Sequence, residues 1–121
     1  MKKIQFAIHD RPVSINRAYA TIRGRRVLTQ DGKNFKKSCW VEAQNAARAN
    51  GIKDKFKYPI SLKIDLYLDS VKRSDVDNYI KLIQDGFEDI FWKDDREIKR
   101  VQAEKHFDKN VQKIVITIEQ L

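Results

Sequence analysis

The chain has 121 residues, of which 41% are hydrophobic and 35% are charged, and its formal net charge is +8. This length and composition predict one domain over residues 1–121 with a single hydrophobic core, and they exclude a disordered tail. No apolar run approaches the roughly 20 residues that span a bilayer, and the opening MKKIQFAIHD does not resemble a signal peptide. Because Cys39 is the only cysteine, neither an intrachain disulfide nor a cysteine-based zinc site can form. We therefore expect a cytoplasmic protein with an inert thiol.

The positive charge is concentrated in the first half of the chain. Residues 1–60 hold 14 basic and 4 acidic residues (+10), whereas residues 61–121 hold 11 basic and 13 acidic ones (−2). This asymmetry favours a nucleic acid as partner, because basic side chains release counterions from phosphates. An anionic membrane is disfavoured, since the basic residues form no amphipathic helix with a bulky apolar face. The candidates for contacts with a nucleic-acid backbone are Arg17, Arg23, Arg25, Arg26, Lys36, Lys37, Lys72 and Arg73.

The first half of the chain predicts two strands and a helix. Alternating apolar residues predict a strand over 4–8, and an arginine-rich loop leads to a second strand near 27–29. The Asp-Gly pair in QDGK, residues 30–33, predicts a turn. Apolar residues at helical spacing predict a helix over 34–50, which Gly51 ends.

The second half predicts a strand, a helix and a hairpin. Strict alternation of apolar and polar residues predicts a half-buried strand over 60–68. Apolar residues three and four apart predict a helix over about 78–89. Alternating segments at 101–107 and 114–118, joined by a turn, predict an antiparallel hairpin. The order β-β-α-β-α-β-β predicts an α+β domain, with two main helices packed on a mixed or antiparallel sheet.

Two aspartates lie one residue apart in KRSDVDNYIK, residues 72–81. Asp75 and Asp77 share a face if the chain is extended through residue 77, whereas on a helix they would point in nearly opposite directions. Two carboxylates this close repel each other unless a positive group lies between them. A divalent cation such as Mg²⁺ suits such a place, because it takes oxygen ligands and needs only one or two carboxylates.

A third acid for this site is available in FWKDDREI, at Asp94 or Asp95. A helix over 78–88 would carry the chain about 16 Å away, at ~1.5 Å per residue. Seven extended residues can return about 23 Å, at ~3.3 Å each, so the acids can meet. Lys81 lies one helical turn after Asp77, and Asp85 lies another turn beyond. A lysine beside acidic metal ligands can hold a phosphate or stabilise charge in the transition state.

Each of these residues also has an ordinary interpretation. Asp75 or Asp77 can serve as a plain helix N-cap. Lys81 can serve as an ion-pair partner for the acids one turn away. Asp94 and Asp95 fit an exposed turn, and Phe91 and Trp92 fit the core; to His9 and His106, which lack ligand spacing, we assign no chemistry.

The motif RSDVDNYIKLIQDGF…FWKDD resembles the signature of the RusA family of Holliday junction resolvases. That signature has Asp-x-Asp-Asn, a lysine three residues after the asparagine, an aspartate four residues further on, and a later Asp-Asp pair. RPVSINRAY is similar to the family's opening Pro-x-Ser-x-Asn-x-x-Tyr segment, and RGRRVLTQDGKNF to its basic loop, strand and turn into the first helix. The likeness covers nearly the whole chain.

The resemblance implies a small homodimer that binds four-way DNA junctions and cuts two opposing strands with Mg²⁺ or Mn²⁺, in DNA recombination and repair. It places three catalytic, metal-binding carboxylates at Asp75, Asp77 and Asp95, and a catalytic lysine at Lys81. The second-choice site residues are Asp94, Asn78 and Asp85. The segment from Asp85 to Asp95 is shorter than the family pattern, which leaves open whether Asp94 or Asp95 points inward. A phage or prophage origin is usual for such proteins.

Two other functions fit the same residues. One is a non-catalytic nucleic-acid-binding module in which the acids only cap a helix. The other is a metal-dependent nuclease that acts on flaps or other branched DNA.

Overall fold

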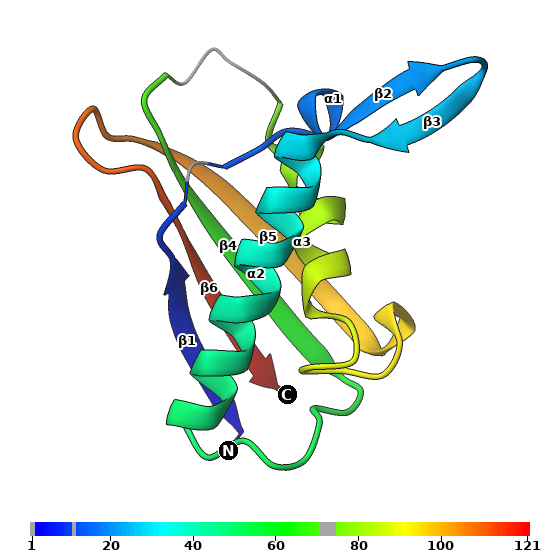
Figure 1. The fold of residues 1–121 in the computed structure, drawn as a ribbon. Helices are drawn as coiled ribbons and strands as arrows, with labels where there is room; N and C mark the ends of the chain where they lie inside the picture. The colour runs from blue at the N-terminus through cyan, green and yellow to red at the C-terminus, as the bar shows by residue number, and fades with distance from the viewer. Residues whose placement is uncertain (1, 11, 71–74) are drawn as a thin grey trace.

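A four-stranded sheet lies at the centre of the fold, and helices α2 and α3 cover one of its faces (Figure 1). The computed structural model describes residues 2–10, 12–70 and 75–121. The elements in chain order are β1 (Lys3–Ile8), α1 (Ile15–Ala18), β2 (Tyr19–Ile22), β3 (Arg25–Leu28), α2 (Gln30–Ala49), β4 (Ile60–Leu68), the 3₁₀ helix η1 (Val76–Tyr79), α3 (Ile80–Phe87), the 3₁₀ helix η2 (Asp95–Glu97), β5 (Ile98–Phe107) and β6 (Lys113–Gln120). The predicted α+β class is confirmed.

Strand β4 follows the alternation of its sequence, and the predicted strand over 60–68 is confirmed. Its five apolar side chains are at most 3% exposed, and the residues between them are half-buried on the opposite face. In β6, Ile114, Ile116 and Ile118 are fully buried on the same inner face. Burial of these two apolar rows under the helices supplies most of the sheet's share of the core.

The predicted hairpin between 101–107 and 114–118 is wrong, because β4 lies between the two strands. β6 pairs antiparallel with β1 and β4, whereas β5 pairs in parallel with β4 on its other side. The backbone N–H of Asp108 donates to the carbonyl of Leu68 at 2.8 Å, so the connection crosses the end of β4. The strongly apolar β6 takes an inner position and the more polar β5 takes the edge.

Helix α2 begins four residues earlier than predicted, so the turn predicted at 30–33 is wrong. The side chain of Thr29 caps the helix by accepting from the N–H of Gly32 at 3.1 Å. Gly32 faces α1, and a Cβ at this position would lie 2.5 Å from the carbonyl oxygen of Ala18. The glycine therefore permits close packing of two helices instead of a turn. The helix ends at Ala49, and Gly51 follows with a φ of +64°.

Helix α3 lies against α2 and covers the aromatic part of the core. A Cβ on Gly86 would lie 2.7 Å from the Cβ of Cys39, so the two helices are in close contact there. Cys39 is fully buried, and burial, with a smaller contribution from the charge of Asp10, raises the pKa of its thiol to about 12. Phe91 and Trp92 are core residues, as the ordinary interpretation predicted. No helix in the described ranges is long and apolar enough to cross a membrane.

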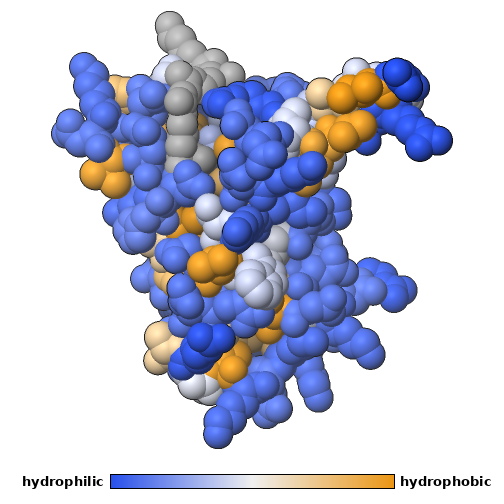
Figure 2. Space-filling view, in the orientation of Figure 1, coloured by the Kyte–Doolittle hydropathy of each residue, from blue (hydrophilic) through white to orange (hydrophobic). Residues whose placement is uncertain are grey.

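Strands β2 and β3 form a hairpin that projects from the body of the protein (Figure 1). Arg23 and Gly24 make the tight turn, with φ values of 52° and 75°. Neither β2 nor the short helix α1 was predicted, and the strand expected at 27–29 is β3, which begins at Arg25. Figure 2 shows hydrophobic surface among hydrophilic surface on this projecting arm, where Ile22 is 56% exposed.

Candidate active site

Lys81 lies at the centre of an acidic group formed by α3 and the segment that follows it. Its Nζ atom lies 3.0 Å from Oδ1 of Asp85 on the same helix and 3.6 Å from Oδ2 of Asp95 at the start of η2. The hydrogen bond to Asp85 and the charge of Asp85 raise the pKa of Lys81, and Asp95 acts in the same direction. The structure therefore brings the predicted site residue Asp95 and the second-choice residue Asp85 to the ammonium of Lys81.

Asp95 and Asp94 face different partners. The indole N–H of the buried Trp92 donates to Oδ1 of Asp95 at 2.8 Å, which fixes this carboxylate at the edge of the core. Asp94 instead caps η2 and contacts the guanidinium of Arg96 at 3.1 and 3.2 Å. The hydrogen bonds from Arg96 hold the pKa of Asp94 below its usual range. Of the two neighbours, Asp95 is the one that faces Lys81.

Glu88 belongs to the same acidic group, although the sequence analysis did not select it. One carboxylate oxygen from each of Asp85, Glu88 and Asp95 lies within 4.8 Å of the other two. Asp85 lies in the last turn of α3 and Glu88 is the residue that follows the helix; in the sequence, their spacing of three is one that places two side chains on one helix face. The spacing of three residues from Asp85 was the signal in the sequence that could have selected Glu88. The return of Asp95 to the same place depends on the tertiary fold.

Asp75 and Asp77 precede this group along the chain, and both are exposed. The chain is extended at Asp75, but Val76–Tyr79 form η1, so the condition that the chain be extended through Asp77 is not met. Among the described residues, neither aspartate belongs to a group of three potential ligands within 4.8 Å of one another. Asp75 makes no capping hydrogen bond through its side chain, and Asp77 lies inside η1, so neither acts as the plain N-cap considered above. Their role as metal ligands remains a prediction.

The family model described as Endodeoxyribonuclease RusA matches residues 11–119. The chain belongs to the RusA family. The match runs from the segment before α1 to β6, so it includes every aspartate and the lysine of the motif. No curated protein matches the chain. The family is one of endodeoxyribonucleases, and the α+β architecture with six strands in two sheets is consistent with it.

The predicted nucleic-acid contacts of this RusA-family chain lie on α1, the projecting hairpin and α2. Arg23, Arg25 and Arg26 are exposed on the hairpin, and the guanidinium of Arg26 lies 4.5 Å from the ring centre of Tyr19. Arg17 forms an exposed ion pair with Asp31 at 3.0 Å.

The remaining predicted residues lie on α2, before η1 and in η1. On α2, Lys36 is half-buried and Lys37 is exposed. Lys72 and Arg73 lie outside the described residues. The second-choice residue Asn78 is half-buried in η1, and its backbone N–H donates to the carbonyl of Asp75 at 3.1 Å.

Proposed function

We propose that this protein is a Mg²⁺-dependent endodeoxyribonuclease that resolves four-way (Holliday) DNA junctions by paired cuts in opposing strands, in DNA recombination and repair. The observation that carries the proposal is the contact of Lys81 with Asp95 in a chain of the RusA family. Two parts of the motif that are separate in the sequence meet at one place, and both are charged groups suited to phosphate chemistry.

The donors at this place suit a hard divalent cation. All the acids of the motif offer carboxylate oxygens, which Mg²⁺ and Mn²⁺ prefer over nitrogen or sulfur ligands. We assign the ligand roles to Asp75, Asp77 and Asp95 on the family motif; of these three, Asp95 is the one that forms an ion pair with Lys81. A bound ion would neutralise charge on the phosphoryl oxygens and activate the attacking water.

Side chains of the protein bind the scissile phosphate and orient the carboxylate of Asp95. The ammonium of Lys81 binds an oxygen of the scissile phosphate and stabilises the charge that develops as the P–O bond breaks. Asp85 raises the pKa of Lys81 and limits its side-chain freedom through the 3.0 Å ion pair. Trp92 holds Asp95 in one orientation, so that the carboxylate does not have to be ordered when substrate binds.

The exposed arginines of the hairpin and the lysines of α2 hold the DNA backbone. Contacts of this kind position a junction without reading its sequence. A twofold homodimer would place two active sites on opposing strands of a junction with matching symmetry. The protein would act in the cytoplasm in association with DNA, and a phage or prophage origin would be usual for it.

The metal role can be tested by changing carboxylates to amides of the same shape. Asp77→Asn and Asp95→Asn should each lower cleavage of a synthetic four-way junction in Mg²⁺ by about 10²-fold or more. Junction binding in EDTA should stay the same or become tighter, because a negative charge near the phosphates is removed. Asp89→Asn is the matched control, since Asp89 is exposed and its φ of 68° is one that asparagine tolerates. Undiminished cutting by both site variants would refute the proposed ligands.

The substrate can be tested with a panel of a four-way junction, a flap and a linear duplex, each with and without Mg²⁺. We expect symmetric cuts in the junction, only with the ion present. Binding without cutting of any substrate would indicate a nucleic-acid-binding module. A preference for the flap would indicate a nuclease for other branched DNA.

A further inference from the structure

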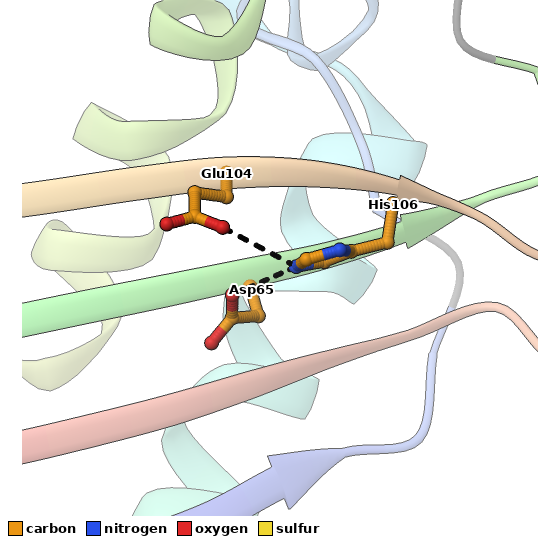
Figure 3. Close-up of side chains that lie close together, drawn as sticks. All are labelled: Asp65, Glu104 and His106. Atoms are coloured by element: carbon orange, nitrogen blue, oxygen red, sulfur yellow. Dashed lines mark hydrogen bonds and ion pairs between the residues drawn. The ribbon is translucent and has the colours of Figure 1, made fainter.

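The face of the sheet opposite the helices carries a second group of potential ligands, Asp65, Glu104 and His106 (Figure 3). Asp65 is on β4, and the other two residues are on the edge strand β5. The parallel register pairs Asp65 with Glu104 and Tyr67 with His106, so all these side chains point to the same face. No chemistry was assigned to His106 from the sequence, because its partner Asp65 is 41 residues away.

The three donor atoms lie close to each other. Nε2 of His106 is 2.8 Å from Oδ1 of Asp65 and 4.0 Å from Oε2 of Glu104, and one donor atom from each residue lies within 4.8 Å of the other two. Around a divalent ion with bonds of about 2.1 Å, neighbouring donors are about 3 to 3.5 Å apart. The Glu104 side chain is 48% exposed and that of Asp65 is 14% exposed. An ion would therefore replace the 2.8 Å hydrogen bond between His106 and Asp65, and the exposed Glu104 would have to move closer to Nε2 than its present 4.0 Å.

The imidazole is oriented by its neighbours. The ring of Tyr67 stacks on His106 with ring centres 4.7 Å apart and planes inclined by 23°. Lys113 is on the neighbouring strand β6, and its ammonium lies 5.1 Å from the centre of the Tyr67 ring. This stacking restricts the plane of the imidazole, and Nε2 points toward both carboxylates (Figure 3). A ligand whose orientation is restricted before binding loses less entropy when it binds.

We propose that Asp65, Glu104 and His106 form a binding site for a first-row transition-metal dication of the Zn²⁺ type. One imidazole nitrogen with two carboxylates is a donor set that Zn²⁺ accepts, with water in the remaining position. Mg²⁺ prefers oxygen donors alone, so this site differs in ion preference from the acids around Lys81. A bound ion ties the edge strand β5 to β4. The proposal does not depend on the proposed nuclease function.

Lys63 is the cation that competes with a metal for this site. Its Nζ atom lies 4.0 Å from Oδ2 of Asp65, on the same face of β4. The lysine lowers the local negative charge, and its removal should therefore strengthen binding of a dication. This gives a variant with an effect opposite in sign to that of a ligand variant.

Zn²⁺ binding to the full-length, metal-free protein can be measured by calorimetry, with Co²⁺ absorption as a second readout. We expect one site that survives in the double variant Asp77→Asn/Asp95→Asn, weakens about tenfold or more in His106→Gln and Glu104→Gln, and tightens in Lys63→Met. His9→Gln is the matched control, since His9 is exposed and lies outside the group. Zn²⁺ should also raise the melting temperature of the wild type but not that of His106→Gln.

Three results would overturn the proposal. They are the absence of saturable Zn²⁺ binding, equal binding by the wild type and His106→Gln, and loss of the site in Asp77→Asn/Asp95→Asn with His106→Gln unaffected. Glu104→Gln keeps the test valid if His106→Gln does not fold, because the Glu104 side chain is 48% exposed.

Discussion

The acidic group around Lys81 and the group on the outer face of the sheet differ in how their charge is balanced. At the end of α3 and the start of η2, Asp85 and Asp95 each form an ion pair with the ammonium of Lys81, and Glu88 lies beside these two carboxylates. On the sheet, Asp65 and Glu104 face an imidazole, which has a positive charge only when it is protonated. The first group is therefore compensated by a lysine at its centre, whereas the second holds a ring nitrogen, which can ligate a metal ion, and has Lys63 only at its edge, 4.0 Å from Asp65.

This difference has a chemical consequence. A lysine among carboxylates suits a site where a phosphate enters, because the ammonium can exchange a carboxylate for a phosphate oxygen. An imidazole among carboxylates suits a site where an ion stays bound, because every donor can ligate it. We therefore expect the first group to affect cleavage and the second to affect stability. The predictions below separate the two, in order of decreasing effect.

Lys81→Ala should produce the largest change. Without the ammonium, cleavage of the junction should fall by about 10²-fold or more, whereas junction binding should change little. Lys81→Arg is the control that retains the charge with a different geometry, and it should recover only part of the activity. Single-turnover cleavage and gel-shift titration measure the two quantities. A larger loss of binding than of cleavage would make Lys81 a docking contact. In either case, Lys81→Ala should leave Zn²⁺ binding at Asp65, Glu104 and His106 unchanged.

Gly86→Ala should destabilise the protein through the contact between α2 and α3. The added Cβ would lie 2.7 Å from the Cβ of Cys39, and such overpacking costs about 1–3 kcal/mol of unfolding free energy. The control is Gln84→Ala, which places the same residue on a less buried part of α3. Urea denaturation gives both values. Equal stability of the two variants would show that α2 and α3 separate easily at Gly86. The position of the Lys81 group would then not depend on this contact.

Arg25→Ala with Arg26→Ala should weaken binding to every junction sequence tested. Loss of two phosphate contacts should reduce the slope of log K against log salt by about 1.8. Arg48→Ala with Lys53→Ala removes the same charge from exposed positions at and beyond the end of α2, and should alter the slope less. An equal change in both double variants would mean that only net charge matters and that the hairpin makes no contact.

Asp85→Asn should lower the pKa of Lys81 toward its ordinary value, since Asp85 is the largest cause of its elevation. A raised pKa in the folded state contributes stability below the unfolded pKa, and this contribution is lost as pH rises through the folded pKa. The effect on stability should be small because the lysine side chain is 61% exposed. NMR titration of Lys81 measures the pKa directly. Glu88→Gln is the control, and an equal fall there would contradict the assigned cause.

The elements predicted well are those whose local pattern agrees with their environment. β4 is buried on one face along its whole length, so its alternation directly reports its position. The predicted α3 is confirmed in its centre, although its first turn is the separate 3₁₀ helix η1. QDGK was misread because Gly32 serves packing against Ala18, and nothing local distinguishes that role from a turn. The hairpin was misread because alternation does not specify which strand is the neighbour.

The sequence alone determined the family, the apolar faces of β4 and β6, and the residues available for phosphate chemistry, because each depends on identity and short spacing. Only the tertiary structure decided which distant side chains meet. The contact of Asp95 with Lys81 depends on the return of the chain after α3, and that of His106 with Asp65 depends on a parallel strand register. Both arise from burial of apolar surface by whole elements, which carries polar side chains to places that their own neighbours in the chain do not specify.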